Sequence, residues 1–338
     1  MARGLDRVDL QMSILVIFWG TAFLAIKVVG ETLDPYQLTW YRYAPFPLLY
    51  GVYLLARRSA TFAQVTGRDW IAMAVLGFFG VVGYHFPLNW GLHDASDGIV
   101  VTGATGSILV ATGPLWTLLL AVALGREKVT RRALLGSLVA FAGVAVVVLL
   151  GKGQAELTVA AKAAVILLAP ISWSFYSIFG KPLAERYGGL FFTGVSLSLG
   201  TFTLLPLAFQ YGTAPLAALR GDQWGWLLFL ALACTAAGYA IWNTALKQRS
   251  ASQVAVFIYA QPVVTAVVGA LLFGVSLTPW FIAGSALVLA GVIQVNKARL
   301  AASTPTPPSL QMAQILPPKP SAQSEKSSTS LSEPVAKP

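Results

Sequence analysis

The sequence of 338 residues is poor in charged side chains. Asp, Glu, Lys and Arg together make up only 11% of it, whereas soluble globular domains carry about 25%. So few charges cannot cover a surface that faces water, and 56% of the residues are hydrophobic. The scarcity of charge therefore excludes an ordinary soluble protein and indicates a chain that is surrounded largely by lipid.

The chain is also poor in residues that form catalytic and metal sites. It has one cysteine, Cys234, and two histidines, His85 and His93. A single cysteine excludes an internal disulfide and a cysteine-based metal site, and its apolar surroundings favour a small buried side chain. The apolar runs contain no nucleophile–base set and no cluster of metal ligands, which a membrane-embedded enzyme would need. We therefore expect no enzyme activity, no metal and no cofactor.

Long apolar runs fill most of the chain. A helix that crosses a bilayer needs about 20 predominantly apolar residues. Runs of this kind predict an all-α polytopic membrane protein with ten transmembrane helices, near 10–30, 36–56, 70–90, 99–124, 132–151, 159–180, 190–210, 224–244, 252–273 and 279–297. Residues 1–9 form a cytoplasmic N-terminus. Residues 301–338 are rich in Pro, Ser and Thr and predict a disordered cytoplasmic tail.

The positions of Lys and Arg predict the orientation in the membrane. The net charge of +10 could suggest a nucleic-acid partner, but the basic residues fall in short clusters between apolar runs, as in the cytoplasmic loops of membrane proteins. With the N-terminus inside, 18 Lys and Arg lie on the inner side and 5 on the outer side. We therefore expect no nucleic-acid binding, a bacterial plasma (inner) membrane location and two cytoplasmic termini.

The two halves of the chain match each other. LWTLLLAVALGREKVT after Pro114 parallels VVTAVVGALLFGVSLT after Pro262. Two further sets of matches keep a constant spacing, 154 residues from Trp19, Lys27 and Glu31 to Trp173, Lys181 and Glu185, and 148 residues from Gly136 and Gly143 to Gly284 and Gly291. These matches predict two five-helix repeats, over 10–151 and 152–300.

An odd number of helices in each repeat gives the second copy the opposite orientation in the membrane. Inverted repeats of this kind occur in secondary transporters, where the substrate site lies near the bilayer midplane between the halves. The positive-inside rule also explains why GREKVT is charged while its counterpart FGVSLT is not. The repeat therefore predicts alternating access around a midplane cavity.

Several segments resemble the drug/metabolite transporter superfamily. They are FWGTAFLAIK in the first predicted helix, WYRY at the start of the second, the Pro-containing fourth helix with GREKVT, ALKQRSASQVAVFIYAQPVVTAVVGALLFGVSLT and the glycine-spaced final helix. Within the superfamily, roughly residues 10–297 resemble the ten-helix EamA-type exporters, which include amino-acid exporters. The resemblance implies efflux of small metabolites through a central cavity between the halves. Val275 and Gln261 stand where family members often carry Glu, and six extra residues lie around HDASDGIVVTGA.

Polar and aromatic side chains near the middle of the predicted helices are the candidates for a substrate cavity. Polar side chains within a membrane face the helix bundle, whereas aromatic rings also occur in interfacial belts and amides also join helices. Packing therefore stays the alternative for each candidate. The set comprises Trp19, Tyr84, His85, Asn89, Trp90, Trp173, Tyr176, Tyr239, Trp242, Asn243, Tyr259 and Gln261.

Three candidates carry or can gain a positive charge. Lys27 and Arg42 lie near the outer ends of their predicted helices, where they either attract an anion at the cavity entrance or extend to the membrane surface. His85 is the one residue near mid-membrane whose charge can change near neutral pH. It is a candidate for proton coupling, with a structural hydrogen bond as the alternative.

Pro114 and Pro262 are the candidate hinges or gates. A proline removes a helix hydrogen bond and bends the helix, and the two occupy matching places in the repeats.

The leading hypothesis is a secondary transporter that exports small organic metabolites, with amino acids or related amphiphiles as the expected class, acting as a monomer or homodimer. A uniporter or channel-like facilitator is the first alternative, and saturable counterflow separates a carrier from a channel. A sensor or scaffold that works through the tail is the second.

Overall fold

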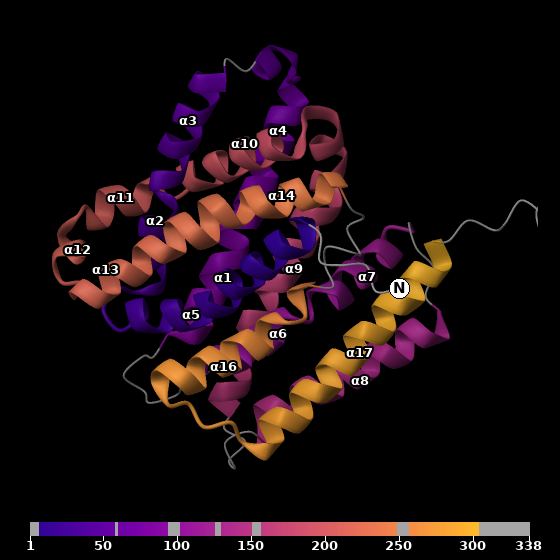
Figure 1. Ribbon diagram of the computed structural model, residues 1–338. Helices are drawn as coiled ribbons and strands as arrows, with labels where there is room; N and C mark the ends of the chain where they lie inside the picture. The colour runs from indigo at the N-terminus through magenta and orange to yellow at the C-terminus, as the bar shows by residue number, and fades with distance from the viewer. Residues whose placement is uncertain are drawn as a thin grey trace, which may run out of the picture. The chain divides into compact units, whose positions relative to one another are not determined.

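The computed structural model of the chain describes residues 7–57, 60–93, 102–125, 130–150, 157–248 and 257–303. Over these ranges the chain forms helices and no strand (Figure 1), as the apolar runs predict. Residues 301–303, which were expected to belong to the tail, are part of the last helix. The rest of the predicted tail, and residues 94–101 within the segment of extra residues, lie outside the described part.

Each of the ten predicted regions contains helical residues. The first half holds α1 (Arg7–Gly30), α2 (Pro35–Tyr43), α3 (Pro45–Arg57), η1 (Ala60–Gln64), α4 (Gly67–Phe78), η2 (Phe79–Gly83), α5 (Tyr84–Leu92), α6 (Gly103–Val110), α7 (Gly113–Ala123), α8 (Arg131–Ala145) and η3 (Val146–Leu150). The second half holds α9 (Leu157–Tyr187), α10 (Gly189–Phe202), α11 (Leu205–Tyr211), α12 (Ala214–Ala217), α13 (Gly221–Leu228), η4 (Phe229–Ala237), α14 (Gly238–Gln248), α16 (Gln261–Phe273) and α17 (Pro279–Ser303). Of the η helices, η1 is a 3₁₀-helix and the others are π-helices.

Five helical stretches in the described ranges are long and apolar enough to cross a membrane. They are Arg7–Gly30, Gly67–Leu92, Gly103–Ala123, Ala160–Tyr187 and Gly221–Trp242. A sixth results if α10 and α11, which meet at an angle of 44°, form one bent span. The predicted number of ten is therefore supported only in part by helix length.

Proline positions explain part of the difference. The predicted helix 36–56 is divided, since α2 ends at Tyr43 and α3 begins at Pro45. A proline lacks the N–H that would continue the helix hydrogen bonds. The bend between α10 and α11 likewise falls directly before Pro206, at the second position of α11. A hydropathy window passes over such breaks because the residues on both sides are apolar.

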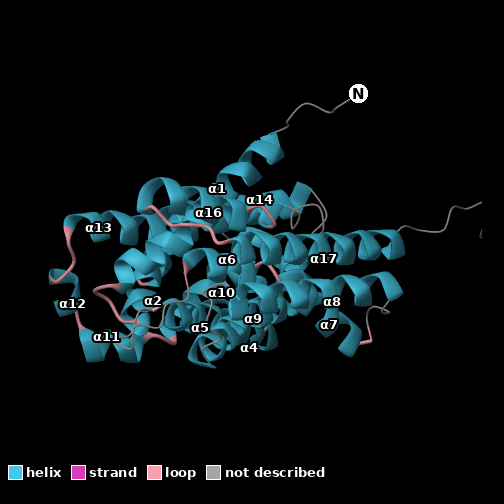
Figure 2. Cartoon of the chain, turned by 90° about the horizontal axis from the view of Figure 1, so that it is seen from below, coloured by secondary structure: helices cyan, strands magenta, loops and turns pink. Residues whose placement is uncertain are grey.

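Close packing of α8 against α17 brings the last helices of the two halves together (Figures 1 and 2). A Cβ atom added at Gly143 would lie 2.6 Å from the carbonyl oxygen of Gly284, and one added at Gly136 would lie 2.7 Å from that of Gly291. Real Cβ contacts essentially never come below 3.0 Å. These four glycines therefore permit the helix contact, which is the packing role expected for small residues in membrane helices.

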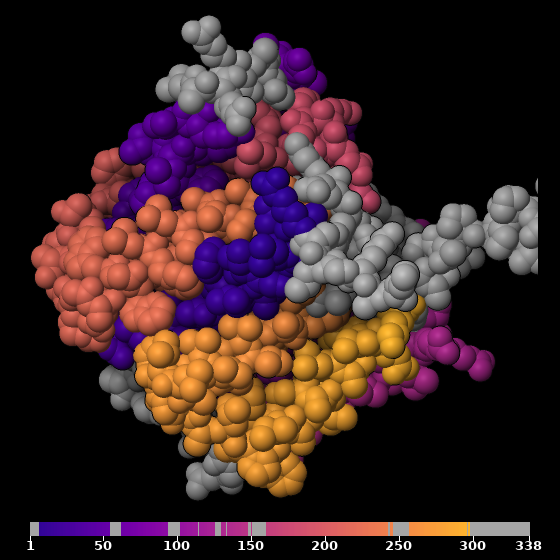
Figure 3. Space-filling view, in the orientation of Figure 1, coloured from indigo at the N-terminus to yellow at the C-terminus, as the bar shows by residue number. Residues whose placement is uncertain are grey.

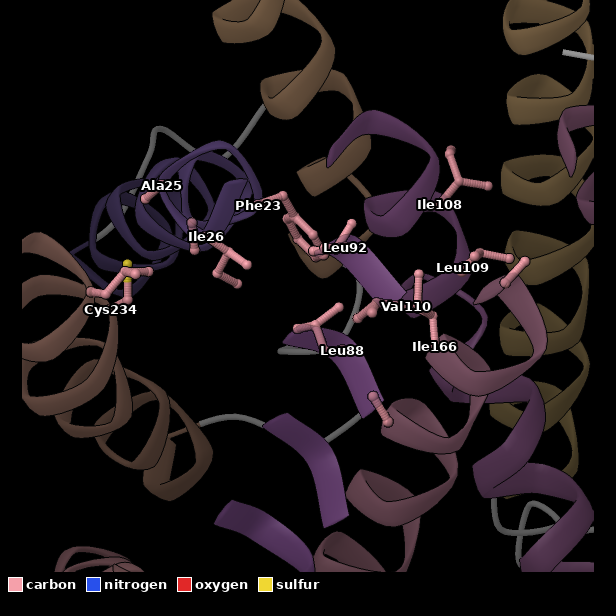
Figure 4. Close-up of a cluster of buried hydrophobic side chains, with 14 of the residues drawn as sticks. Phe23, Ala25, Ile26, Leu88, Leu92, Ile108, Leu109, Val110, Ile166 and Cys234 are labelled. Carbon is pink, nitrogen blue, oxygen red and sulfur yellow. The ribbon is translucent and has the colours of Figure 1, made fainter. Parts of the chain in front are cut away.

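Buried apolar side chains from several helices meet in the largest hydrophobic cluster (Figure 4). Phe23 of α1, Leu88 and Leu92 of α5 and Ile108 of α6 are among its members. Cys234 belongs to the same cluster, where its thiol donates to the carbonyl oxygen of Phe18 at 3.3 Å. The cysteine is thus a small buried side chain, as its apolar surroundings predict.

Large apolar side chains also cover the outer faces of the helices. On α16 these include Val263, Val267, Leu271 and Leu272, all of which are exposed. Figure 3 shows α16 and α17, in orange and yellow, spread over the lower part of one face. Soluble monomers rarely expose contiguous apolar patches larger than a few hundred Å², and apolar faces such as these are suited to contact with lipid.

Candidate functional site

The π-helix η4 supplies polar groups to the interior. Its widened turns disrupt the regular i to i−4 hydrogen bonds, and such segments occur often at functional sites. The carbonyl oxygen of Cys234 accepts a hydrogen bond from Trp19 Nε1 at 2.9 Å, and the Thr235 hydroxyl donates to the carbonyl oxygen of Leu230 at 2.9 Å. Thr235 therefore stands on the inner side of η4 with its oxygen available as an acceptor.

Arg42 of α2 uses that acceptor. Its Nε donates to Thr235 Oγ1 at 3.0 Å, and its Nη1 lies 3.4 Å from His85 Nδ1. The side chain is buried, with an exposed fraction of only 4%. The alternative in which Arg42 extends to the membrane surface is therefore wrong, because the guanidinium points inward between α2, α5 and η4.

Tyr43 and Tyr239 continue these contacts. The Tyr43 hydroxyl lies 2.5 Å from His85 Nε2 and 3.4 Å from the Tyr239 hydroxyl. Because a guanidinium can only donate, Nδ1 of His85 acts as an acceptor toward Arg42, and the ring proton then stands on Nε2, facing Tyr43. We call Arg42, Tyr43, His85, Thr235 and Tyr239 the polar network.

Aromatic rings cover one side of the polar network. Trp19 and Trp173, which are repeat counterparts, lie 6.4 Å apart between ring centroids. Trp242 lies 5.6 Å from Trp19, and Tyr84 lies 5.7 Å from Trp173. Tyr176 stacks on Trp173 at 5.3 Å. We call these five residues the aromatic cluster.

Tyr239 joins the two groups of residues. Its ring lies 6.0 Å from Trp19 and 5.9 Å from Trp173, while its hydroxyl belongs to the polar network. The ring of Tyr84 also lies 4.7 Å from that of His85. Seven of the twelve predicted cavity residues are therefore brought together here, namely Trp19, Tyr84, His85, Trp173, Tyr176, Tyr239 and Trp242.

Two buried amides lie at other places. Asn89 donates to Thr39 Oγ1 at 2.9 Å, whereas its Oδ1 has no hydrogen-bond partner among the described residues. Gln261 Oε1 is likewise buried without a partner in the part of the chain that the structure describes. Uncompensated amide oxygens are costly in an apolar interior, so both are candidates for contact with a polar ligand group.

Three predicted site residues stand apart from these contacts. Trp90 is 44% exposed, and no ring contact joins it to the aromatic cluster within the described ranges. Tyr259 is buried in the largest hydrophobic cluster. Lys27 Nζ lies 3.5 Å from the carbonyl oxygen of Leu92, at the end of α5, where a cation complements the helix dipole. The Asn243 side chain lies outside the described part.

The candidate hinges stand at helix starts. Pro114 is the second residue of α7, which follows α6 after a short turn, and Pro262 is the second residue of α16. At the first turn of a helix a proline is tolerated, because the N–H that it lacks would have no partner there. The matching prolines therefore mark interruptions in the predicted fourth and ninth helices.

Sequence reasoning missed two members of the polar network. Tyr43 stands in the WYRY segment next to Arg42, and Thr235 precedes Tyr239 by one helical turn. An i, i+4 search around Tyr239 could have found the threonine. Neither position has a polar counterpart 154 residues away in the other half, since Leu197 and Val81 stand there, so the repeat gave no signal.

Comparison with known proteins gives a consistent result. The sequence model of the EamA-like transporter family matches residues 7–149 and 161–297. An "Uncharacterized transporter" of Archaeoglobus fulgidus is 29% identical over 85% of this chain and 98% of its own length. A "Probable terminal-alkyne amino-acid exporter" of Streptantibioticus cattleyicolor is 31% identical over 86% of this chain and 95% of its own.

A solved crystal structure shares the fold. It aligns with a TM-score of 0.62 over 88% of this chain and 99% of the other, at 17% identity. The family match covers both halves of the chain and leaves out only their connection and the two ends. With its apolar helices, this integral membrane protein belongs to the EamA-like transporter family, and the family sequence is present twice.

Proposed function

We propose that the chain is a secondary transporter that exports small organic metabolites, of the class of amino acids or related amphiphiles, by alternating access around a midplane site. The observation that carries the proposal is the meeting of both halves at the polar network and the aromatic cluster. The first half contributes Trp19, Arg42, Tyr43, Tyr84 and His85, and the second contributes Trp173, Tyr176, Thr235, Tyr239 and Trp242.

The chemistry of this region suits a solute with a polar head and an apolar body. Guanidinium, imidazole and hydroxyl groups lie on one side and indole and phenol rings on the other. The relative named as an amino-acid exporter supports the same class. A substrate site between the halves also agrees with the arrangement of inverted-repeat transporters.

Reciprocal contacts support the inverted repeat. Gly136 and Gly143 correspond to Gly284 and Gly291, yet the close contacts join Gly136 with Gly291 and Gly143 with Gly284. Each glycine of the first half thus contacts the counterpart of the other glycine of that half, as a two-fold axis between antiparallel copies requires. The π-helix η2 also matches the last part of η4 at the spacing of 154.

A second reciprocal pair suggests where the transporter closes. Arg186 Nη1 donates to Asp69 Oδ2 at 2.9 Å, at the predicted inner side. Their counterparts, 154 positions away, are Thr32 and Gln223, whose side chains are hydrogen-bonded at 2.9 Å at the predicted outer side. We infer that these contacts belong to the inner and outer closures that alternating access needs.

The outer contact is extended by an ion pair, since Arg220 Nη2 lies 3.0 Å from Glu31 Oε2. The inner contact is extended by Tyr187, whose hydroxyl donates to Asp69 Oδ2 at 2.6 Å. Both side chains of the Arg220–Glu31 pair are exposed, and exposed ion pairs contribute only about 0–1 kcal/mol. A contact this weak is suited to forming and breaking in each transport cycle.

A solute-flux screen in proteoliposomes tests the proposal. The purified protein is assayed with amino acids, other amphiphiles and drugs under an imposed pH gradient, and at least one class is expected to move. Failure of every solute to move would contradict the transport function. A pH gradient that changes the rate would support proton coupling, for which His85 is the candidate group. The same preparation shows by cross-linking whether the protein is a monomer or a homodimer.

A further inference from the structure

We propose that Arg42 binds the carboxylate group of the transported solute, so that the substrates are small carboxylate-bearing amphiphiles, with apolar amino acids as the typical members. This inference rests on the proposed transport function and adds the chemical group by which the solute is recognised.

Arg42 carries a buried charge that has no counter-charge among the described residues. Arg42 is 96% buried, and a guanidinium does not lose its proton in proteins. Its acceptors among the described residues, Thr235 Oγ1 and His85 Nδ1, are both neutral in the arrangement shown. A buried ion without an opposite charge is strongly unfavourable. An anion from outside the protein would therefore be attracted to this place.

Five of the six acidic side chains of the described ranges have partners elsewhere, and the sixth, Asp9, stands in the first turn of α1. Asp34 caps the start of α2 by accepting the N–H groups of Tyr36 and Gln37. Asp69 pairs with Arg186, and Glu31 and Asp222 both pair with Arg220. Glu185 pairs with Lys181 on the surface of α9. The recorded ion pairs thus leave Arg42 without a carboxylate.

The donor geometry suits a carboxylate in particular. A guanidinium has five N–H groups in a planar fork, and it binds carboxylates with two parallel hydrogen bonds. Two of the five have acceptors here, on Thr235 and His85, so the remaining N–H groups of Nη1 and Nη2 are available. The hydroxyls of Tyr43 and Tyr239, which lie 3.4 Å apart in the polar network, offer further O–H donors for a carboxylate.

The aromatic cluster accounts for the rest of the solute. The ring of Tyr239 connects the polar network with Trp19 and Trp173. Indole faces attract ammonium groups through the ring quadrupole and also bury apolar side chains. An amino acid whose carboxylate contacts Arg42 would therefore place its ammonium group or side chain against these rings.

Equilibrium binding to the full-length protein in phosphatidylcholine nanodiscs tests the inference. The probes are two pairs of radiolabelled compounds that differ only in the carboxylate, L-phenylalanine with phenethylamine and L-leucine with isoamylamine. We expect the wild type to bind each acid more tightly than its amine. Arg42→Gln should weaken binding of the acids by at least about tenfold, as for a lost partner of a buried charge, and should change binding of the amines by less than about threefold.

Two variants control for folding and for general loss of charge. Arg42→Lys keeps the cation without the planar fork and should keep part of the preference for acids. Arg131→Gln makes the same change at an exposed position at the start of α8, and it should bind like the wild type. Equal weakening of acids and amines in both Arg42 variants would mean that Arg42 only holds η4 in place, and would overturn the inference.

Competition experiments separate the possible anions. Displacement of L-phenylalanine by inorganic phosphate or chloride as effectively as by 3-phenylpropionate would overturn the inference in favour of a simple anion site. Loss of binding in nanodiscs that contain phosphatidylglycerol would overturn it in favour of a lipid headgroup. Carboxylate binding that depends on Arg42, without flux, would contradict the proposed transport alone. Flux of the amines but not of the acids would support the proposed transport function and would contradict the proposed role of Arg42.

Discussion

Buried polar residues determine what the interior of this transporter can bind. Arg42, His85 and the Tyr43 hydroxyl form a chain of contacts at 3.4 and 2.5 Å. Helix-end position alone did not predict this, because a long arginine side chain near a helix end can turn either to the surface or to the bundle. Only the position of α2 relative to η4 decides between them. Sequence reasoning did identify His85, since histidine is rare in these helices.

The hydrogen bonds of His85 lead to the first prediction. Uptake of a second proton would place it on Nδ1, next to Arg42, and would break that contact. Arg42, Tyr43, Tyr84 and Tyr239 are the charged or titratable groups around the imidazole. If this contact couples transport to protons, His85→Gln should remove the pH dependence of flux that the wild type shows.

Counterflow rates measured at several pH values would check this, with His93→Gln as the matched control because His93 lies at the end of α5, away from the polar network. An unchanged pH profile in His85→Gln would show that the histidine serves only as a structural hydrogen-bond partner.

Helix existence could be predicted from the sequence more completely than helix continuity. Apolar runs located helical residues in all ten regions, because burial of backbone polar groups in lipid leaves few alternatives to a helix. The interruption at Ala44, before Pro45, was not expected. Nor were the π-helices, since their widened turns depend on tertiary contacts such as the hydrogen bond from Trp19 to the carbonyl of Cys234.

Glycine contacts between α8 and α17 lead to a prediction for these elements. In Gly143→Ala the new Cβ would lie 2.6 Å from the carbonyl oxygen of Gly284, so the helices must separate. We expect the free energy of unfolding to fall by about 1–3 kcal/mol, as it does when extra atoms are forced into a well-packed interior. Gly51→Ala on α3, where a Cβ meets nothing within 4 Å, should be neutral or stabilising by up to about 1 kcal/mol.

Thermal unfolding of both purified variants in detergent would check this difference. Equal unfolding temperatures for Gly143→Ala and Gly51→Ala would contradict the proposed helix contact.

At the scale of the whole molecule, the repeat connects the fold with its function. The spacing of 154 residues, which is visible in the sequence, also relates the contact of Asp69 and Arg186 to that of Gln223 and Thr32. Sequence reasoning could not show which repeated positions touch, because a two-fold axis pairs each residue with the counterpart of another. For the same reason, the candidate site could be predicted only in part. The sequence matched Trp19 with Trp173 as counterparts, but it did not show that the two residues are neighbours.

Opposite orientation of the halves gives the third prediction. Thr130 and Thr278 are counterparts at the spacing of 148, and the proposed inverted repeat would place them on opposite sides of the membrane. In a Cys234→Ala background, Thr130→Cys should react with a membrane-impermeant maleimide only from the cytoplasmic side, and Thr278→Cys only from the outside. Labelling of both from the same side would contradict the inverted arrangement.

The central claim is that the two halves form a carrier that alternates around a shared site. Counterflow tests it most directly, with proteoliposomes preloaded with an unlabelled solute from the flux screen and diluted into the same solute in labelled form. The account predicts transient accumulation of label above equilibrium, saturable in the outer concentration and reduced by at least about tenfold in Arg42→Gln for a carboxylate solute. Label that only equilibrates, at a rate linear in concentration, would contradict it and indicate a channel.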